Sequence, residues 1–320
     1  MGIFSMKGYN KPGKGVDDLA PGNDGAMLFF EIFIRKFWKL IQTNLLFCVA
    51  NIPAFLIIYF LAGTFSNAIF GTFPNEIAGI VGLSEPDLNN ADYRMIYMII
   101  DIGVRVCAAT LFTIFWGSGP ATAGMHYILR NYAREENAFI LSDFWDAIKD
   151  NFKQSLAVFI IDILFMFIFF YGIYFYSSQT NILRFAKYIL YCLFIFYTIV
   201  HLFIYPLMVR YKLSLGKLLK NAALFSMASL LYSFLVIILL GLLTIGIGYL
   251  GIFMLTSTGL SVLITIYVLL VVVILFAFCG FIVSYNAECQ IRKYIDDSAQ
   301  VEEKESFKKE DKPINRRQLY

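Results

Sequence analysis

Six long apolar runs constrain this chain more than any other feature of its sequence. They cover approximately residues 44–61, 95–116, 156–175, 185–205, 225–247 and 260–285. A helix rises about 1.5 Å per residue, so about 20 residues cross the ~30 Å hydrocarbon core of a bilayer. Hydrophobic residues make up 59% of the chain and charged residues 15%, against about 45–50% and about 25% in soluble domains. We therefore predict an all-α membrane protein with six transmembrane helices.

The chain between the second and third runs contains a break and then two short amphipathic stretches. Glycine frees the backbone and proline removes a backbone donor, so we expect the helix to end within residues 117–120. Further on, Phe144, Ile148 and Phe152 recur at helical spacing, with charged residues on the other faces. This pattern predicts a helix lying on the membrane surface. Residues 27–43 and 207–224 predict similar amphipathic helices before the first and fifth runs.

A short sequence pattern precedes each odd-numbered run. Its three copies are Trp38-x2-Ile41-x2-Asn44, Trp145-x2-Ile148-x2-Asn151 and Leu215-x2-Leu218-x2-Asn221. We interpret the membrane domain as three units, each an amphipathic helix followed by a hairpin of two spans. The alternative is chance similarity, because short patterns of this kind also arise at random in apolar sequences.

The distribution of basic residues predicts the orientation of the spans. Cytoplasmic loops of membrane proteins carry an excess of lysine and arginine. Of the 26 lysines and arginines, 22 lie before the first span, after the sixth, or in the connectors of residues 117–155 and 207–224. Three lie on the opposite side of the spans and one, Arg105, lies within a span. We therefore predict that both termini are cytoplasmic.

Composition divides the chain into three parts. Residues 1–25 are polar and lack periodicity, which predicts a disordered cytoplasmic arm. Residues 26–290 form the predicted membrane domain, and residues 291–320 form a charged cytoplasmic tail. Within the membrane domain, residues 62–94 carry four acidic residues and one basic residue, and we expect them to form a loop on the outer side.

Four ionisable residues lie inside the predicted spans: Asp101, Arg105, Asp162 and His201. A charge in hydrocarbon costs at least about 2.5–3.5 kcal/mol, so such groups usually face a partner or a cavity. Asp101 and Arg105 are four residues apart and share a helix face, so they can pair. The long arginine side chain can also reach toward Asp162. We predict an intramembrane polar cluster that ties the second span to the third, and the alternative is a polar pathway or substrate site.

The sequence offers little for enzyme chemistry. His126 and His201 are the only histidines, and neither has the spacing of a metal-binding motif. Ser118 lies between two glycines but lacks the outer spacing of a nucleophile elbow. The segment around Lys14 lacks the Ser or Thr and the strand of a phosphate-binding loop. We predict that the protein is not an enzyme and needs no cofactor or metal.

The connector of residues 207–224 has four basic residues and no acidic ones. Attraction to anionic lipid headgroups, about 1 kcal/mol for each basic residue near the surface, accounts for this composition. The alternative is a docking site for a cytoplasmic protein. No motif in the chain indicates nucleic-acid binding. We predict that the lipid bilayer is one partner of the protein.

Several motifs resemble one known family. They are Gly119-Pro120-Ala121-Thr122-Ala123, then Tyr127 and Arg130, then Asp143-Phe144-Trp145-x6-Phe152-Lys153-Gln154, and at the first span Trp38-Lys39-Leu40-x3-Asn44-Leu45-Leu46. In these motifs the chain is similar to the YesL-like family of small bacterial integral membrane proteins, domain of unknown function 624. The resemblance covers roughly residues 28–290. The chain departs from the family pattern in residues 62–94 and in Asn51-Ile52-Pro53-Ala54.

The resemblance implies a location and a setting. Family members are multi-pass proteins of the bacterial cytoplasmic membrane, and their genes often lie beside carbohydrate importers, polysaccharide-degrading enzymes and two-component sensors. We therefore expect a non-enzymatic accessory protein of carbohydrate uptake or utilisation, associated with permease subunits of an importer. One alternative is a regulatory component that couples to a sensor kinase. Another is a small secondary transporter, which paired broken helices at the midplane would favour, although only residues 51–53 interrupt a predicted span convincingly.

Overall fold

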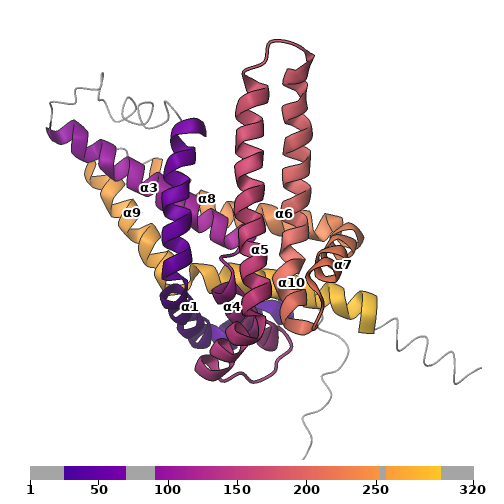
Figure 1. Cartoon of the computed structure of the whole chain (residues 1–320). Helices are drawn as coiled ribbons and strands as arrows, with labels where there is room; N and C mark the ends of the chain where they lie inside the picture. The colour runs from indigo at the N-terminus through magenta and orange to yellow at the C-terminus, as the bar shows by residue number, and fades with distance from the viewer. Residues whose placement is uncertain (1–24, 70–90, 253–256, 297–320) are drawn as a thin grey trace, which may run out of the picture. The chain divides into compact units, whose positions relative to one another are not determined.

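The structure is a computed structural model that describes residues 25–69, 91–252 and 257–296. In these ranges every regular element is helical, which confirms the predicted all-α class. In chain order the α-helices, labelled in Figure 1, are α1 (Ala26–Ile69), α3 (Ala91–Trp116), α4 (Pro120–Ala133), α5 (Ile140–Ser177), α6 (Ala186–Arg210), α7 (Leu215–Ala228), α8 (Leu230–Ile252), α9 (Ser257–Leu270) and α10 (Phe276–Ile291). A 3-10 turn (Ile182–Phe185) precedes α6, and π-helical turns follow α9 (Val271–Leu275) and α10 (Arg292–Asp296).

The helices provide between four and six candidate membrane spans. Four single stretches are long and apolar enough: Ala26–Gly63, Ile140–Ser177, Ile182–Arg210 and Thr265–Tyr294. Two more candidates are bent pairs, Asp101–Trp116 with Pro120–Ala133 at 57° and Leu215–Ala228 with Leu230–Thr244 at 93°. Counting each bent pair as one span gives six. The number of passes and the cytoplasmic placement of both termini stay predictions.

The chain divides into two compact units, Met1–Phe37 and Trp38–Tyr320. In the first unit α1 begins at Ala26, and the rings of Phe29 and Phe33 stack with their centroids 6.5 Å apart. Glu31 and Arg35, one turn apart, form an exposed ion pair of 3.9 Å. Residues 1–24 of the predicted arm and residues 297–320 of the predicted tail lie outside the described part of the chain.

The prediction of a separate surface helix before the third span is wrong. Helix α5 runs unbroken from Ile140 to Ser177. The first two residues of the predicted apolar stripe, Phe144 and Ile148, face the protein interior. Phe144 and Ile148 are buried and lie against Gly124 of α4, where a Cβ atom would be 2.9 Å from the carbonyl oxygen of Phe144 and 3.0 Å from Cγ1 of Ile148. Trp145 and Phe152 remain exposed. Periodicity shows that one helix face is apolar, but it does not show whether lipid or protein covers that face.

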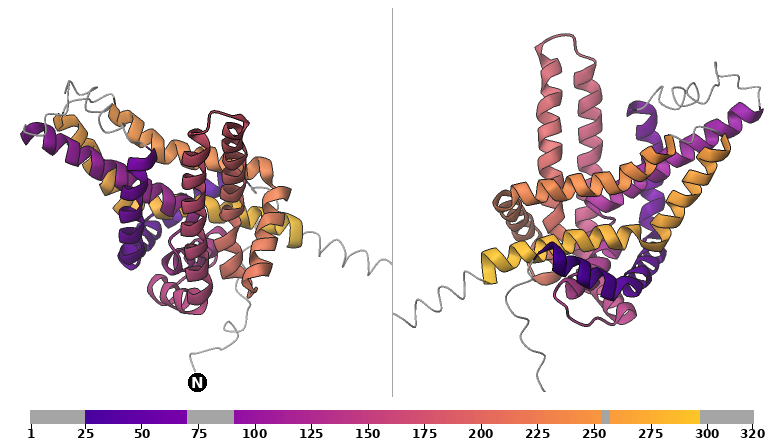
Figure 2. Two further views of the ribbon diagram at one scale, coloured as in Figure 1. Left: turned by 45° about the horizontal axis from the view of Figure 1, so that its top comes forward. Right: turned by 180° about the vertical axis from the view of Figure 1, so that it is seen from behind.

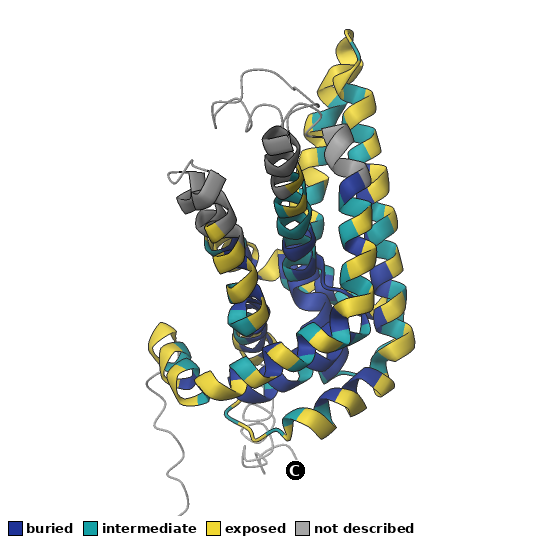
Figure 3. Cartoon of the chain, turned by 90° about the vertical axis from the view of Figure 1, so that its left-hand side faces the viewer, coloured by how far each residue is buried: buried dark blue, intermediate teal, exposed yellow. Residues whose placement is uncertain are grey.

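Helices α5 and α6 form an antiparallel hairpin, and Figures 1 and 2 show them side by side. Stacked rings join them, Phe165 on Tyr197 with centroids 3.9 Å apart and Phe169 on Phe194 at 4.2 Å. Toward the tip of the hairpin most side chains are exposed or half-buried (Figure 3), and many of them are apolar. Such a surface suits contact with lipid rather than with water.

Asn44 of α1 fastens the π-helical turn between α9 and α10. Its Nδ2 donates to the carbonyl oxygens of Val271, at 2.9 Å, and Val272, at 2.7 Å. Its Oδ1 accepts from the backbone N–H of Ala277 at 2.8 Å. A π-helical turn interrupts the regular α-helical bonding pattern, and the buried Asn44 side chain provides partners for three backbone groups there.

The asparagine in the second copy of the sequence pattern makes a different contact. Asn151 donates from Nδ2 to the carbonyl oxygen of Ala147, one turn earlier in its own helix, at 2.9 Å. Asn44 instead reaches another helix. The first two copies also lead into continuous helices, whereas α7 and α8 are separated by the 93° bend. The interpretation as three equivalent units therefore stays a prediction from the sequence.

Replacing Asn44 tests the role of this contact. Leucine has a similar size but cannot bond the three backbone groups, and each unsatisfied buried polar group costs about 1–3 kcal/mol. We expect Asn44→Leu to lower the free energy of unfolding by at least about 1–3 kcal/mol, as measured in denaturant titrations of the micelle-bound protein. Asn151→Leu is the matched control, because its amide bonds only within α5. Equal losses for the two variants would contradict this account.

Candidate functional site

The break between α3 and α4 is built from the glycines and the proline that the sequence places there. Gly117 and Gly119 have φ of 75° and 80°, a region that favours glycine. Pro120 begins α4, where its missing N–H would have had no helical partner. The Thr122 hydroxyl accepts from the backbone N–H of Ser118 at 2.8 Å. The predicted end of the helix within residues 117–120 is confirmed.

Helix α4 lies in the interior, because 11 of its 14 residues are buried. The first of the two predicted amphipathic stretches is therefore a core helix. It contacts α5, α6 and α10. Gly124 of α4 makes apolar contacts with α5, and polar residues of α4 bond to groups on α6 and α10.

Tyr205 of α6 occupies the space beside this break. Its hydroxyl oxygen accepts from the backbone N–H of Gly119 at 3.1 Å, and a Cβ on Gly117 would lie 2.5 Å from its ring. The ring of His126 on α4 stacks on Tyr205 with centroids 5.8 Å apart. Nδ1 of His126 lies 2.8 Å from Oγ of Ser284 on α10. These contacts join the start of α4 to α6 and α10.

Asp162 of α5 is fully buried and bonds to α6. The Tyr197 hydroxyl donates to Oδ1 at 2.5 Å, and Nε2 of His201 lies 3.1 Å from the carboxylate. Arg105 instead pairs with Asp101 on its own helix at 2.8 Å and lies over the ring of Tyr59, 5.9 Å from its centroid.

The structure thus separates the predicted intramembrane cluster into two sites. Asp101 pairs with Arg105, and Asp162 meets His201, while no ion pair joins Arg105 to Asp162 among the described residues. Depth along a helix limits which side chains can meet, but the rotation of each helix decides which ones do. The partners of Asp162 come from α6, the neighbour of α5 in the hairpin, rather than from α3.

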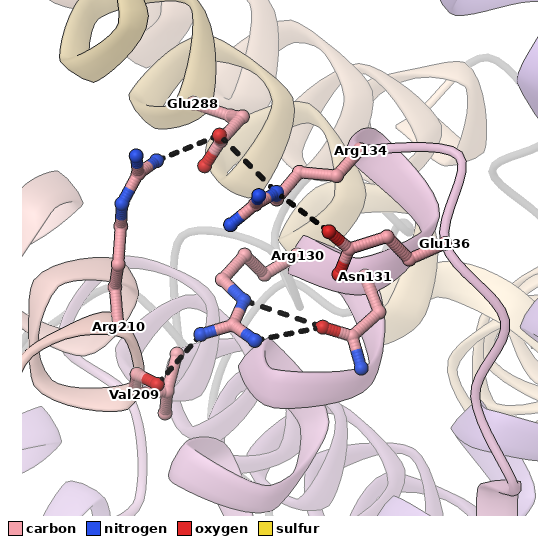
Figure 4. A network of polar contacts seen from close by, with 7 residues as sticks. All are labelled: Arg130, Asn131, Arg134, Glu136, Val209, Arg210 and Glu288. Carbon is pink, nitrogen blue, oxygen red and sulfur yellow. Dashed lines mark hydrogen bonds and ion pairs between the residues drawn. The ribbon is translucent and has the colours of Figure 1, made fainter. Parts of the chain in front are cut away.

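A second polar network joins the C-terminal ends of α4, α6 and α10 (Figure 4). Glu288 of α10 is 7% exposed and accepts from Arg210 of α6 at 2.6 Å. Arg134, just after α4, lies 3.8 Å from the same carboxylate and 3.0 Å from Glu136. A largely desolvated carboxylate is tolerated when cations and hydrogen bonds surround it.

Arg130 adds a third guanidinium to this network. It donates from one terminal nitrogen to the carbonyl oxygen of Val209 and from the other to Oδ1 of Asn131, both at 2.8 Å. Its guanidinium also lies over the ring of Tyr127, 4.9 Å from the centroid. Arg130 therefore ties α4 to the end of α6, while Arg134 and Arg210 share the Glu288 carboxylate and Arg134 also pairs with Glu136.

A polar groove of about 710 Å³ lies next to the network. Its lining residues come from α4, the first part of α5 and the 208–214 segment: Tyr127, Asp143, Asp146, Ala147, Asp150, Asn151, Gln154, Met208, Val209, Arg210, Tyr211, Lys212, Leu213 and Ser214. Asp143 accepts from the backbone N–H of Phe139 at 2.8 Å. Gln154 donates to the carbonyl oxygen of Leu213 across the groove at 3.1 Å.

The sequence-predicted residues fall into distinct structural roles. Gly119 lies in the turn before α4, Pro120 and Thr122 lie in the first turn of α4, and Arg130 belongs to the network. Asp143 lines the groove, whereas Phe144 is buried and Trp145 is exposed. Within the described residues, no group of three or more His, Cys, Asp or Glu side chains could hold a metal ion.

Sequence reasoning missed several members of the site. Tyr205 and Ser284 look like ordinary residues of apolar spans, and Arg134 and Arg210 look like solvated ends of spans. The one available signal was Glu288, an isolated acidic residue in the largely apolar sequence of α10. A single acid in such a helix indicates a cationic partner, but it does not identify that partner.

Comparison with known families agrees with the sequence motifs. The model of the family described as "Protein of unknown function, DUF624" matches residues 40–173, which confirms the predicted resemblance to the YesL-like family. The matched range includes α4 and most of α5, whereas α6 and α10 follow it. No curated protein and no solved structure matches the chain.

The buried Glu288 gives a direct test of the network. Glu288→Gln removes the charge that neutralises Arg210, whose side chain is 10% exposed. Breaking a buried pair costs about 3–5 kcal/mol, and we expect the lower end because glutamine keeps an acceptor. Lys149→Met, which breaks the exposed pair with Asp146, should cost at most about 1 kcal/mol. Comparable unfolding free energies for the two variants would contradict the proposed importance of the network.

Proposed function

Because the chain resembles the YesL-like family of membrane proteins, we propose that it has a non-enzymatic accessory role in bacterial carbohydrate uptake or utilisation. In this role the protein holds a segment of a partner, a permease subunit of an importer, at one end of its helices. The polar groove between α5 and the 208–214 segment is the observation that carries the proposal. The carbohydrate setting rests on the family resemblance alone.

The lining of the groove suits a polypeptide segment better than a small organic ligand. Small-molecule pockets of similar volume are lined predominantly by apolar and aromatic side chains, whereas most residues of this groove are polar or charged. Asp143, Asp146 and Asp150 are spaced three and four residues apart, so they share one face of α5. Asp146 pairs with Lys149. The acidic wall is therefore complementary to a partner segment that carries lysine or arginine.

Both walls of the groove are held in place before any partner binds. Arg130 bonds to the carbonyl of Val209 and Gln154 bonds to the carbonyl of Leu213, so two side chains fix the 208–214 segment. The ion pair of Arg210 with Glu288 connects the same segment to α10. A site that is already ordered loses less conformational entropy on binding. This supports a docking surface rather than an incidental hollow.

The predicted orientation gives the groove a cytoplasmic position. The two connectors that line it, residues 117–155 and 207–224, belong to the predicted cytoplasmic side because of their basic residues. The bilayer is then the second partner, contacted by the apolar surface of the α5–α6 hairpin. A sensor kinase remains the alternative docking partner, because its segment would meet the same acidic wall.

The buried charges support an accessory role over a transporter. Ionisable groups that mark a substrate pathway face a water-filled cavity, but Asp162 is fully buried between α5 and α6. The cavity beside His201 has a volume of only about 20 Å³. These features fit a packed contact between helices, which favours holding a partner over moving a solute.

Site-specific photo-crosslinking in native bacterial membranes tests the proposal. A photoreactive amino acid at Lys212, inside the groove, should capture a permease subunit that mass spectrometry identifies. The same amino acid at Lys217, exposed on α7 and outside the groove lining, is the matched control. Capture of a sensor kinase at Lys212 would replace the permease proposal with the regulatory one. Equal capture at both positions, or none at Lys212, would contradict docking in the groove.

The acidic wall can be tested in the same experiment. Asp143→Asn with Asp150→Asn removes two charges, and asparagine can still accept from the Phe139 N–H. If each charge contributes about 0.7 kcal/mol, capture should fall roughly tenfold. Unchanged capture would show that charge complementarity does not select the partner.

A further inference from the structure

A small internal cavity lies among α3, α4, α6 and α10. It has a volume of about 20 Å³, and its polar lining residues are Thr113, Thr122, His126, His201 and Tyr205. A cavity needs about 10–15 Å³ to hold a water molecule. The cavity therefore has room for one water molecule and is too small for an organic ligand.

One hydroxyl at this cavity is buried and has no hydrogen-bond partner among the described residues. Thr113 of α3 is 3% exposed, and its Oγ1 makes no hydrogen bond. The other threonine of the lining differs, because Thr122 bonds to Ser118. A buried hydroxyl without a hydrogen bond is unfavourable, so Thr113 indicates a polar ligand in the cavity.

The two histidines of the lining each use one ring nitrogen in a contact outside the cavity. Nε2 of His201 faces the Asp162 carboxylate at 3.1 Å. A carboxylate accepts hydrogen bonds, so neutral His201 carries its proton on Nε2 and its Nδ1 is an acceptor. Nδ1 of His126 lies 2.8 Å from Oγ of Ser284, so its Nε2 is the nitrogen left for the cavity.

We infer that the cavity binds one water molecule that bridges the two histidines. The water donates its two protons to Nδ1 of His201 and Nε2 of His126, and its oxygen accepts from Oγ1 of Thr113. His126 then carries its proton on Nδ1 and donates it to Ser284. The water, Thr113 and both imidazole N–H groups then each donate to an acceptor, and the water makes three hydrogen bonds, the usual number for a buried water.

The bound water completes one chain of hydrogen bonds through the interior. The chain runs from Tyr197 through Asp162 and His201 to the water, and then through His126 to Ser284. It links α5 and α6 to α4 and α10 independently of the network at Glu288. This inference does not depend on the proposed docking function.

Nuclear magnetic resonance can test the inference because the chain contains only two histidines. The full-length protein would be labelled with ¹⁵N at histidine and studied in lipid bilayers at neutral pH. We expect two neutral imidazoles, protonated on Nε2 in His201 and on Nδ1 in His126. The unprotonated nitrogen of each ring should show a cross-peak to water. Ser284→Ala should shift the His126 signals alone and thereby assign them.

Threonine variants provide the decisive comparison. Thr113→Val keeps the side-chain shape but removes the third contact of the water, so both water cross-peaks should be lost. Thr198→Val is the matched control, because Thr198 is also buried but bonds within α6. If Thr113→Val does not fold, Thr113→Ser should retain both cross-peaks. The inference would be overturned by a doubly protonated ring or by the opposite tautomer in either histidine. It would also be overturned if the water cross-peaks were absent from the wild type or from the Thr113→Ser variant, or if they were retained in Thr113→Val.

Discussion

The structure depends on a rule for its interior: polar groups buried between helices must find partners there, because water cannot reach them. Helix α4 shows the consequence. It is short and mostly buried, yet it contains His126 and Arg130. His126 meets Ser284 of α10, and Arg130 meets the carbonyl of Val209 at the end of α6. These directional contacts fix the rotation and height of α4, which apolar packing alone would leave less defined.

The two polar assemblies act at different depths of the same helices. Around Tyr205, the contacts join the first half of α4 to the last turns of α6 and, through His126 and Ser284, to the middle of α10. Around Glu288, they join the ends of the same three helices. Two fixed points along a helix also determine its tilt. The 208–214 segment, which continues from α6, is placed against α5 as a result, and this placement forms the groove.

Features that depend on neighbouring residues along the chain could be predicted from the sequence. The break before Pro120 follows from backbone geometry, and the pair of Asp101 with Arg105 follows from the helical repeat. Features that depend on the rotation of one helix against another could not. The stripe at Phe144 and Ile148 is apolar whether lipid or α4 covers it. Asp162 could have faced α3 or α6 at a similar depth.

The site also combines parts of the chain that look unrelated in sequence. Arg130 and Asp143 lie within the range that matches the DUF624 family, residues 40–173. Arg210 and Glu288 lie beyond it, Arg210 at the end of a span where charged residues are expected to be solvated and Glu288 within the apolar sequence of α10. Only the packing of α6 and α10 against α4 brings these residues together. Sequence motifs therefore indicated one wall of the groove and not the network that supports it.

The central claim is that polar contacts hold the groove in one preformed shape. The most direct measurement is the distance between spin labels at Lys149 of α5 and Lys212 of the opposite wall, by pulsed electron paramagnetic resonance in bilayers. Both side chains are exposed, so labels should not disturb the packing. The account predicts one narrow distance distribution, which broadens when Arg130→Met removes the bond to Val209. A broad distribution in the unaltered protein, or no change in the variant, would contradict it.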